Sequence, residues 1–259
     1  MTMETGSRTP LLDLFQRGEV PRDVRILAAR GILAPRAHEQ IALLLLLVGD
    51  EDAGVRQAAE ETLASIPRLA LEAFLARSDV TDDVRVFFGA RGVSPAAEPA
   101  AAAEEPLVET AEPHAESERV RVGAGERLTR LPVIERLKRA MRGGRDERAL
   151  LIRDHNKIVA AAVLSNPRVN DAEIESFARM PNVSDDVLRM IGNSRAWIKN
   201  YSIVQALTKN PRTPLAMSLT LIALLHERDV RLVAADRNVP EPLRAIARKM
   251  IFVGKTRTR

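Results

Sequence analysis

A short phrase that marks the start of a helix recurs along this chain of 259 residues. In each copy an apolar residue precedes a capping or helix-opening residue, acidic groups follow in the first turn, and an apolar run comes next. The copies occupy residues 20–25, 80–85, 183–189 and 239–244. A recurring helix start predicts an all-α fold built of helical repeats, and such folds usually present binding surfaces.

The composition agrees with closely packed helices. Apolar residues make up 46% of the chain, whereas aromatic residues make up only 3%. Ala, Leu, Val and Ile supply most of the apolar set, and Ala and Leu are strong helix formers. The chain has no Cys, which excludes disulfides, thiolate metal sites, iron–sulfur clusters and cysteine nucleophiles.

The sequence carries no membrane signal. Its longest apolar run, residues 41–48, is far shorter than the roughly 20 residues that a spanning helix needs. This run should instead lie deepest in a helical core. Residues 1–10 are polar and lack the apolar stretch of a signal peptide. We therefore expect a cytoplasmic protein with no membrane partner.

Charge and composition vary sharply along the chain. By count, residues 1–92 carry a net charge of about −3, residues 93–125 about −5, and residues 126–259 about +12. Pro, Ala and Glu dominate residues 93–126, and such a segment buries too little apolar surface to fold. We predict a disordered acidic linker there. A short helix over residues 100–105, confined by flanking prolines, is the alternative.

This division predicts two short α-solenoid units of helical repeats joined by the linker. The first unit covers residues 9–92 and the second covers residues 127–253. A basic tail follows over residues 254–259.

The first unit contains Val-Arg pairs at residues 24–25, 55–56 and 84–85. Their spacing of about 30 residues lies within the period of helix–turn–helix repeats. Residues 49–59 read Gly-Asp-Glu-Asp-Ala-Gly-Val-Arg-Gln-Ala-Ala. This segment resembles the opening of the second helix in HEAT repeats, and the resemblance covers two to three units. It implies that Asp caps the helix while Val and Ala face the stack.

The second unit is punctuated by asparagines. Asn166 and Asn210 each precede a proline, so one helix should end there and the next should open soon afterwards. Residues 210–240 resemble the leucine-rich repeat variant, a family in which short helices alternate in a curved right-handed stack. That family also has a cysteine-bound iron–sulfur module, which this chain cannot have. Residues 130–252 more broadly resemble a helical module of uncharacterised bacterial proteins, which implies a fold and no activity.

No catalytic constellation is evident in the sequence. The four histidines are His38, His114, His155 and His226. None has the spacing of a helical pair of zinc ligands. The acidic pairs at residues 82–83 and 185–186 fit helix opening better than paired catalytic carboxylates, and residues 142–145 lack the spacing of a phosphate loop. We therefore expect no enzymatic activity, no cofactor and no metal.

The most suggestive cluster lies at residues 193–201, which hold the only Trp and the only Tyr of the chain. We assign partner binding to Arg195, Trp197, Lys199, Asn200 and Tyr201. Aromatic residues beside cations are typical of a binding hot spot. The alternative is that Trp197 and Tyr201 pack between two repeats with their polar tips at the rim.

A second cluster is basic and begins on an amphipathic helix predicted over residues 132–141. The cations of this predicted basic face are Arg136, Lys138, Arg139, Arg142, Arg145, Arg148 and Lys157. A basic stripe on helical repeats can bind a phosphate backbone in a salt-dependent way. The alternative is a solvated helix face, partly neutralised by the acidic linker.

The sequence thus predicts a non-enzymatic scaffold or adaptor that binds an unidentified protein partner through its basic C-terminal module. Nucleic-acid binding through the basic face of residues 127–259 is the second hypothesis. A helical-repeat DNA glycosylase ranks third, because such an enzyme needs a carboxylate beside an aromatic cleft, which Trp197 and Tyr201 do not supply.

Overall fold

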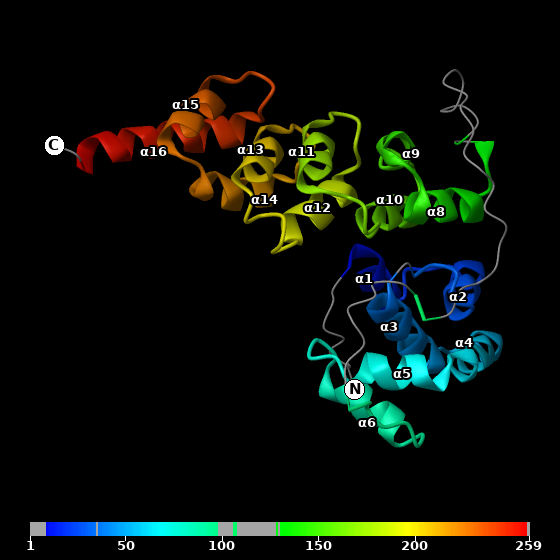
Figure 1. The fold of residues 1–259 in the computed structure, drawn as a ribbon. Coiled ribbons are helices and arrows are strands. Elements are labelled where there is room, and N and C mark those ends of the chain that lie inside the picture. Colours follow the sequence, from blue (N-terminus) through cyan, green and yellow to red (C-terminus); the bar gives the residue numbers. More distant parts are fainter. Residues whose placement is uncertain (1–8, 35, 98–105, 108–127, 129, 258–259) are drawn as a thin grey trace. The chain divides into compact units, whose positions relative to one another are not determined.

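Every regular element in the described part of the chain is a helix (Figure 1). The computed structural model describes residues 9–34, 36–97, 106–107, 128 and 130–257. The predicted all-α class is therefore confirmed for these residues. The chain divides into unit 1, which comprises Met1–Glu147 with Ser165–Pro167, and unit 2, which comprises Arg148–Leu164 with Arg168–Arg259.

Unit 1 contains α1 (Pro10–Gln16), α2 (Arg22–Ala29), α3 (Ala37–Val48), α4 (Ala53–Ser65), α5 (Arg68–Leu75), α6 (Asp82–Gly89) and α8 (Val133–Arg142). Helix α9 (Arg145–Leu151) begins in unit 1 and ends in unit 2. Unit 2 continues with α10 (Lys157–Leu164), α11 (Asp171–Arg179), α12 (Asp185–Asn193), α13 (Tyr201–Lys209), α14 (Leu215–Leu221), the 3₁₀ turn η1 (Ile222–Leu224), α15 (Glu227–Ala235) and α16 (Glu241–Arg257).

Helix α3 supplies much of the core of unit 1, where it contacts α1, α2 and α4. Its sequence is apolar on nearly every side, so neighbouring helices must cover more than one of its faces. Leu43, Leu44 and Leu47 are buried, whereas Leu46 is 37% exposed. The predicted deep position is confirmed for residues 41–45 and Leu47, whereas Leu46 is exposed and Val48 is half-buried.

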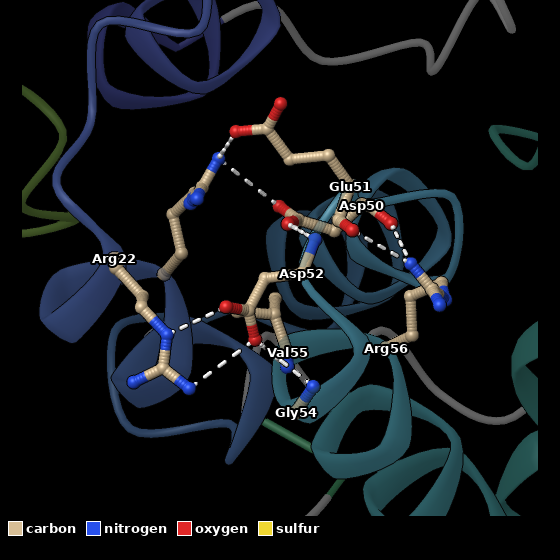
Figure 2. Close-up of polar contacts among 8 residues, drawn as sticks. Arg22, Asp50, Glu51, Asp52, Gly54, Val55 and Arg56 are labelled. Carbon is tan, nitrogen blue, oxygen red and sulfur yellow. Dashed lines mark hydrogen bonds and ion pairs between the residues drawn. The ribbon is translucent and has the colours of Figure 1, made fainter.

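All four copies of the recurring phrase begin helices, namely α2, α6, α12 and α16. Ser184 caps α12, because its hydroxyl accepts a hydrogen bond from the Val187 N–H. At α4 the capping residue is Asp52, whose carboxylate accepts the N–H groups of Gly54 and Val55 at 2.9 and 3.1 Å (Figure 2). These side chains satisfy backbone donors that the first helical turn leaves open.

The same Asp52 carboxylate also joins α4 to α2. Arg22 on α2 donates from Nε to one carboxylate oxygen at 2.6 Å and from Nη2 to the other at 3.3 Å (Figure 2). These bonds from Arg22, followed by the bond from the Val55 N–H, lower the pKa of Asp52 to about 2. The carboxylate therefore stays charged at neutral pH and caps α4 while it binds α2.

The Arg that follows Val in each repeated segment of unit 1 binds the loop before a helix. Arg56 donates to the carbonyls of Asp50 and Glu51 at 2.7 and 2.9 Å (Figure 2). Arg85 donates to the carbonyl of Leu75, the last residue of α5, and to that of Arg77 in the loop that follows. Arg25 lies 3.5 Å from the Asp50 carboxylate. The Val-Arg pairs of unit 1 thus supply arginines that bind the chain between helices, in addition to lying near the start of a helix.

The predicted linker, residues 93–126, lies for the most part outside the described residues, as does the alternative helix over residues 100–105. Two of its described residues bind unit 1. The Ala96 N–H donates to the Glu72 carbonyl at 3.0 Å, and the Leu107 N–H donates to the Gln40 side chain at 2.7 Å. These parts of the predicted linker therefore contact folded helices.

Two asparagines that follow helices in the sequence also form hydrogen bonds to the ends of earlier helices. The side chain of Asn210, directly after α13, donates to the carbonyls of Ala178 and Met180 at 2.7 and 3.0 Å. Asn166 donates in the same way to the Ala140 carbonyl at 2.9 Å. Both asparagines are buried. Their amides satisfy carbonyls near the end of an earlier helix, where the helix itself supplies no donor.

A buried carboxyl lies in the first turn of α3. Glu39 is 4% exposed, and its Oε1 has no hydrogen-bond partner among the described residues. Burial raises the pKa of Glu39 to about 7, although the charge of Arg36 and a hydrogen bond with Thr9 oppose this shift. Thr9 is the residue that caps α1, so this carboxyl lies where α1 meets α3.

We predict that Glu39→Gln weakens the pH dependence of stability. The raised pKa means that the folded state favours the protonated acid. The contribution to stability is full below the ordinary pKa of 4.5 and is lost as the pH rises through about 7. Between about pH 5 and pH 9, the free energy of unfolding should fall by about 3 kcal/mol more in the parent protein than in the variant.

Urea unfolding across that range measures the difference. Asp83→Asn, at an exposed carboxylate of α6, is the control for the change in net charge and should follow the parent curve. Parallel curves for Glu39→Gln and the parent protein would contradict the prediction.

Candidate binding site

The predicted partner-binding cluster forms the turn between α12 and α13. The N–H groups of Trp197 and Ile198 both donate to the Ser194 carbonyl at 3.1 Å, and the Asn200 N–H donates to the Trp197 carbonyl at 3.0 Å. Residues 194–200 therefore form a hydrogen-bonded turn with helical spacing, which we call the 194–200 turn. Its backbone is held by its own hydrogen bonds.

The side chain of Met217 on α14 lies close to the chain just before the turn. A Cβ added at Gly192, near the end of α12, would overlap the sulfur of Met217 and lie 2.8 Å from its Cε. Only a glycine allows Met217 to pack this closely on the α12 backbone. The C-terminal end of α12 is thereby positioned against α14.

Asn200 fixes the other end of the turn. Its side-chain oxygen accepts the Ser202 N–H at 3.0 Å and so caps α13. Its side-chain nitrogen donates to the Asp171 carboxylate at 3.1 Å. Both polar atoms of the Asn200 side chain are therefore used within unit 2.

Tyr201 joins α13 to the start of α15. Its hydroxyl donates to the Asp229 carboxylate and accepts the His226 N–H at 3.1 Å, while its ring stacks on the His226 ring with centroids 4.4 Å apart. Gln205 donates to the other oxygen of Asp229. Desolvation, then the bond to Asp229, raises the pKa of Tyr201, and the bond from Tyr201 lowers the pKa of Asp229. The proton thus stays on Tyr201 near neutral pH.

The five predicted residues therefore have different surroundings. Asn200 and Tyr201 hold the turn in place, and Trp197 is half-buried. Arg195 and Lys199 are exposed and make no hydrogen bond or ion pair within the described part of the chain. Residues four apart share one side of a helical turn, whereas residues two apart do not. If this rule for helices holds in the turn, Arg195 and Lys199 share a side that Trp197 does not.

Sequence reasoning did not identify Gln205, His226 and Asp229 as neighbours of Tyr201. They lie four, 25 and 28 residues further along the chain. The spacing of Gln205 on the same helix is a detectable signal, since residues four apart are neighbours. His226 and Asp229 meet Tyr201 only through tertiary packing, which no local pattern encodes.

Two residues assigned to the predicted basic face are buried, so the prediction is wrong for them. Arg136 and Arg148 are each only 4% exposed. Lys138 and Arg139 are ion-paired, with Glu135 at 3.4 Å and with Glu147 at 2.6 Å. The remaining members are Arg142 and Arg145, which are exposed, and Lys157, which is half-buried. A helical pattern places Arg136 beside apolar positions, and burial of its long side chain follows from that neighbourhood.

Arg148 belongs to a buried ion pair in unit 2. Its Nη2 lies 2.8 Å from one oxygen of Glu173 and 3.0 Å from the other, and its Nε donates at 3.2 Å. The side chains of Arg148 and Glu173 are only 5% and 3% exposed. A forked guanidinium suits such a pair, because it satisfies both carboxylate oxygens at once.

Within the described residues, no group of three His, Asp or Glu side chains is arranged to hold a metal ion. None of the described helices combines the length and apolarity needed to cross a membrane. Comparisons with protein-family models, curated proteins and solved structures found no match to this chain.

We predict that Arg148→Ala lowers the free energy of unfolding by about 3–5 kcal/mol, because it leaves Glu173 charged, buried and unpaired. Chemical denaturation of the full chain measures this loss. Replacing both partners in Arg148→Met/Glu173→Leu removes the charges together and should recover most of the stability. A double variant as unstable as Arg148→Ala would contradict this account.

We predict that Gly192→Ala lowers the free energy of unfolding by up to about 2 kcal/mol. Overpacking against Met217 costs about 1–3 kcal/mol, and the better helix propensity of Ala offsets about 1 kcal/mol of this. The matched control is Gly89→Ala at the end of α6, where a Cβ meets nothing within 4 Å. Thermal unfolding should show Gly89→Ala to be neutral or stabilising; equal losses in both variants would contradict the packing explanation.

Proposed function

We propose that this protein is a non-enzymatic scaffold or adaptor. In this proposal the chain forms two α-solenoids joined by an acidic linker. The first, over residues 9–92, is HEAT-like, and the second, over residues 127–253, is similar to the leucine-rich repeat variant. The recurring helix starts and the all-helical fold support the repeat architecture. The extended surfaces of such stacks suit protein binding more than enclosed chemistry.

The proposed partner binds unit 2 at the 194–200 turn. The observation that supports this site is that Arg195 and Lys199 are exposed and unpaired within the described residues, on a turn whose own fold is fixed. Long cations with no structural role remain available to a partner. A preformed turn also loses little conformational freedom when a partner binds.

Nucleic-acid binding is the second candidate. It is favoured by the exposed cations Arg142 and Arg145 of the predicted basic face, together with the net charge of about +12 over residues 126–259. Burial of Arg136 and Arg148 and ion pairing of Arg139 leave this surface fewer free cations than the sequence alone indicates.

We predict that Arg195→Glu/Lys199→Glu abolishes capture of the protein partner from a nuclease-treated extract of the native host. Charge reversal at two exposed positions should remove the favourable contacts and leave the thermal transition within about 1 °C, since exposed substitutions change stability little. Quantitative mass spectrometry of the captured proteins measures the loss. Trp197→Ala should weaken capture less, because that indole is half-buried.

Arg237→Glu/Lys249→Glu is the matched control, since it reverses one Arg and one Lys at other exposed positions of unit 2. Capture should be retained in this variant. If the 195/199 variant captures the same proteins as the parent, the proposed site is wrong. If capture occurs only without nuclease, the nucleic-acid function replaces the protein-binding one.

A further inference from the structure

The segment around the 194–200 turn has an unbalanced positive charge. Residues 187–200 contain three cations and no acidic residue. These cations, Arg189, Arg195 and Lys199, are all exposed, and none has an ion pair within the described chain. Several other cations of unit 2 have acidic partners, as in Arg148 with Glu173, Arg179 with Glu175, Arg212 with Asp185 and Arg231 with Glu227, whereas Arg237 and Lys249 stand singly at exposed positions.

The spacing of the two cations on the turn suits carboxylates. Arg195 and Lys199 are four residues apart in a turn that includes one helical bond, from the Ile198 N–H to the Ser194 carbonyl, and this spacing favours side chains on the same side. The planar guanidinium of Arg195 can hold both oxygens of one carboxylate, and the ammonium of Lys199 can bind a second carboxylate as a point charge. Two acids about one helical turn apart would match this pair.

The aromatic residues on this segment do not form a stacking platform. The Tyr201 ring is covered by the His226 ring, and its hydroxyl is bonded to Asp229. The helical spacing sets Trp197 away from Arg195 and Lys199. Single-stranded nucleic acid is usually held by aromatic rings on which bases stack, beside a continuous basic groove.

Acidic residues also interrupt the basic surface. The Asp171 carboxylate accepts a hydrogen bond from Asn200, the residue that follows Lys199. Asp185 and Asp186 lie at the start of α12, the helix that leads into the turn. A long polyanion such as a nucleic-acid backbone would pass close to these charges, whereas a short acidic segment can avoid them.

We infer that the partner contacts the 194–200 turn through an acidic protein segment, whose carboxylates bind Arg195 and Lys199, and that Trp197 and Tyr201 position the turn. This inference rests on the proposed function, since it names the chemistry of the partner at the same site. Exposed ion pairs are individually weak and are screened by salt. The contact should therefore be sensitive to ionic strength.

Fluorescence anisotropy with the full chain tests this inference. The probes are a labelled helical peptide of Glu and Ala, its counterpart with Gln in place of Glu, and labelled single- and double-stranded DNA. The Glu/Ala peptide should bind at low salt and the Gln/Ala peptide should not. Arg195→Glu/Lys199→Glu should weaken Glu/Ala binding about tenfold or more, and Arg237→Glu/Lys249→Glu should leave it unchanged.

A charge-swapped probe provides a positive control, because a Lys/Ala peptide should bind the 195/199 variant better than the parent protein. Tighter binding of DNA than of the Glu/Ala peptide, or equal losses in the control variant, would overturn the inference. If host-protein capture needs Arg195 and Lys199 but the Glu and Gln peptides bind equally, the acidic segment is wrong and the proposed function stands. If Arg195→Glu/Lys199→Glu captures the same host proteins as the parent, the proposed function fails.

Discussion

The need to pair the backbone N–H and C=O groups at helix ends is the constraint on which this structure depends. Apart from α16, the described helices contain between 7 and 13 residues. Isolated helices shorter than about 12–15 residues are marginal in water, because nucleation is costly and the end groups lack partners. Here Asp52 and Ser184 close the starts of helices, and Asn210 closes an end. Helices such as α3, whose start has no side-chain cap, depend instead on packing against their neighbours.

The charged residues of the chain likewise divide into those that have partners within the fold and those that do not. Asp52 binds backbone donors and an arginine at once, and Arg148 with Glu173 is a closed pair in the interior. These charges are fixed by the fold. Arg195 and Lys199 have no such partners in the described chain, so their charge faces solvent. The distinction between these two groups, more than the total charge, is the basis of the partner site proposed above.

Local chemistry was well predicted from the sequence, and long-range pairing was not. The four phrases begin helices with acidic residues in the first turn, and Ser184 also caps one of them; both effects act within one turn, which a short pattern records. The Asn–Pro stops also act locally. The contact of Arg148 with Glu173 spans 25 residues, and that of Asn210 with Ala178 spans 32. Such contacts depend on how helices pack, and so the burial of Arg148 could not be read from its basic neighbours.

The two bonds from Asn210 link the ends of helices that are far apart in sequence. One buried amide sits directly after α13 and donates to carbonyls at the end of α11. If α11 frays, the amide loses its acceptors in a buried place, and this cost discourages the opening. Opening of the end of α11 is therefore coupled to the chain that follows α13. Local unfolding here would involve α11 and α13 together.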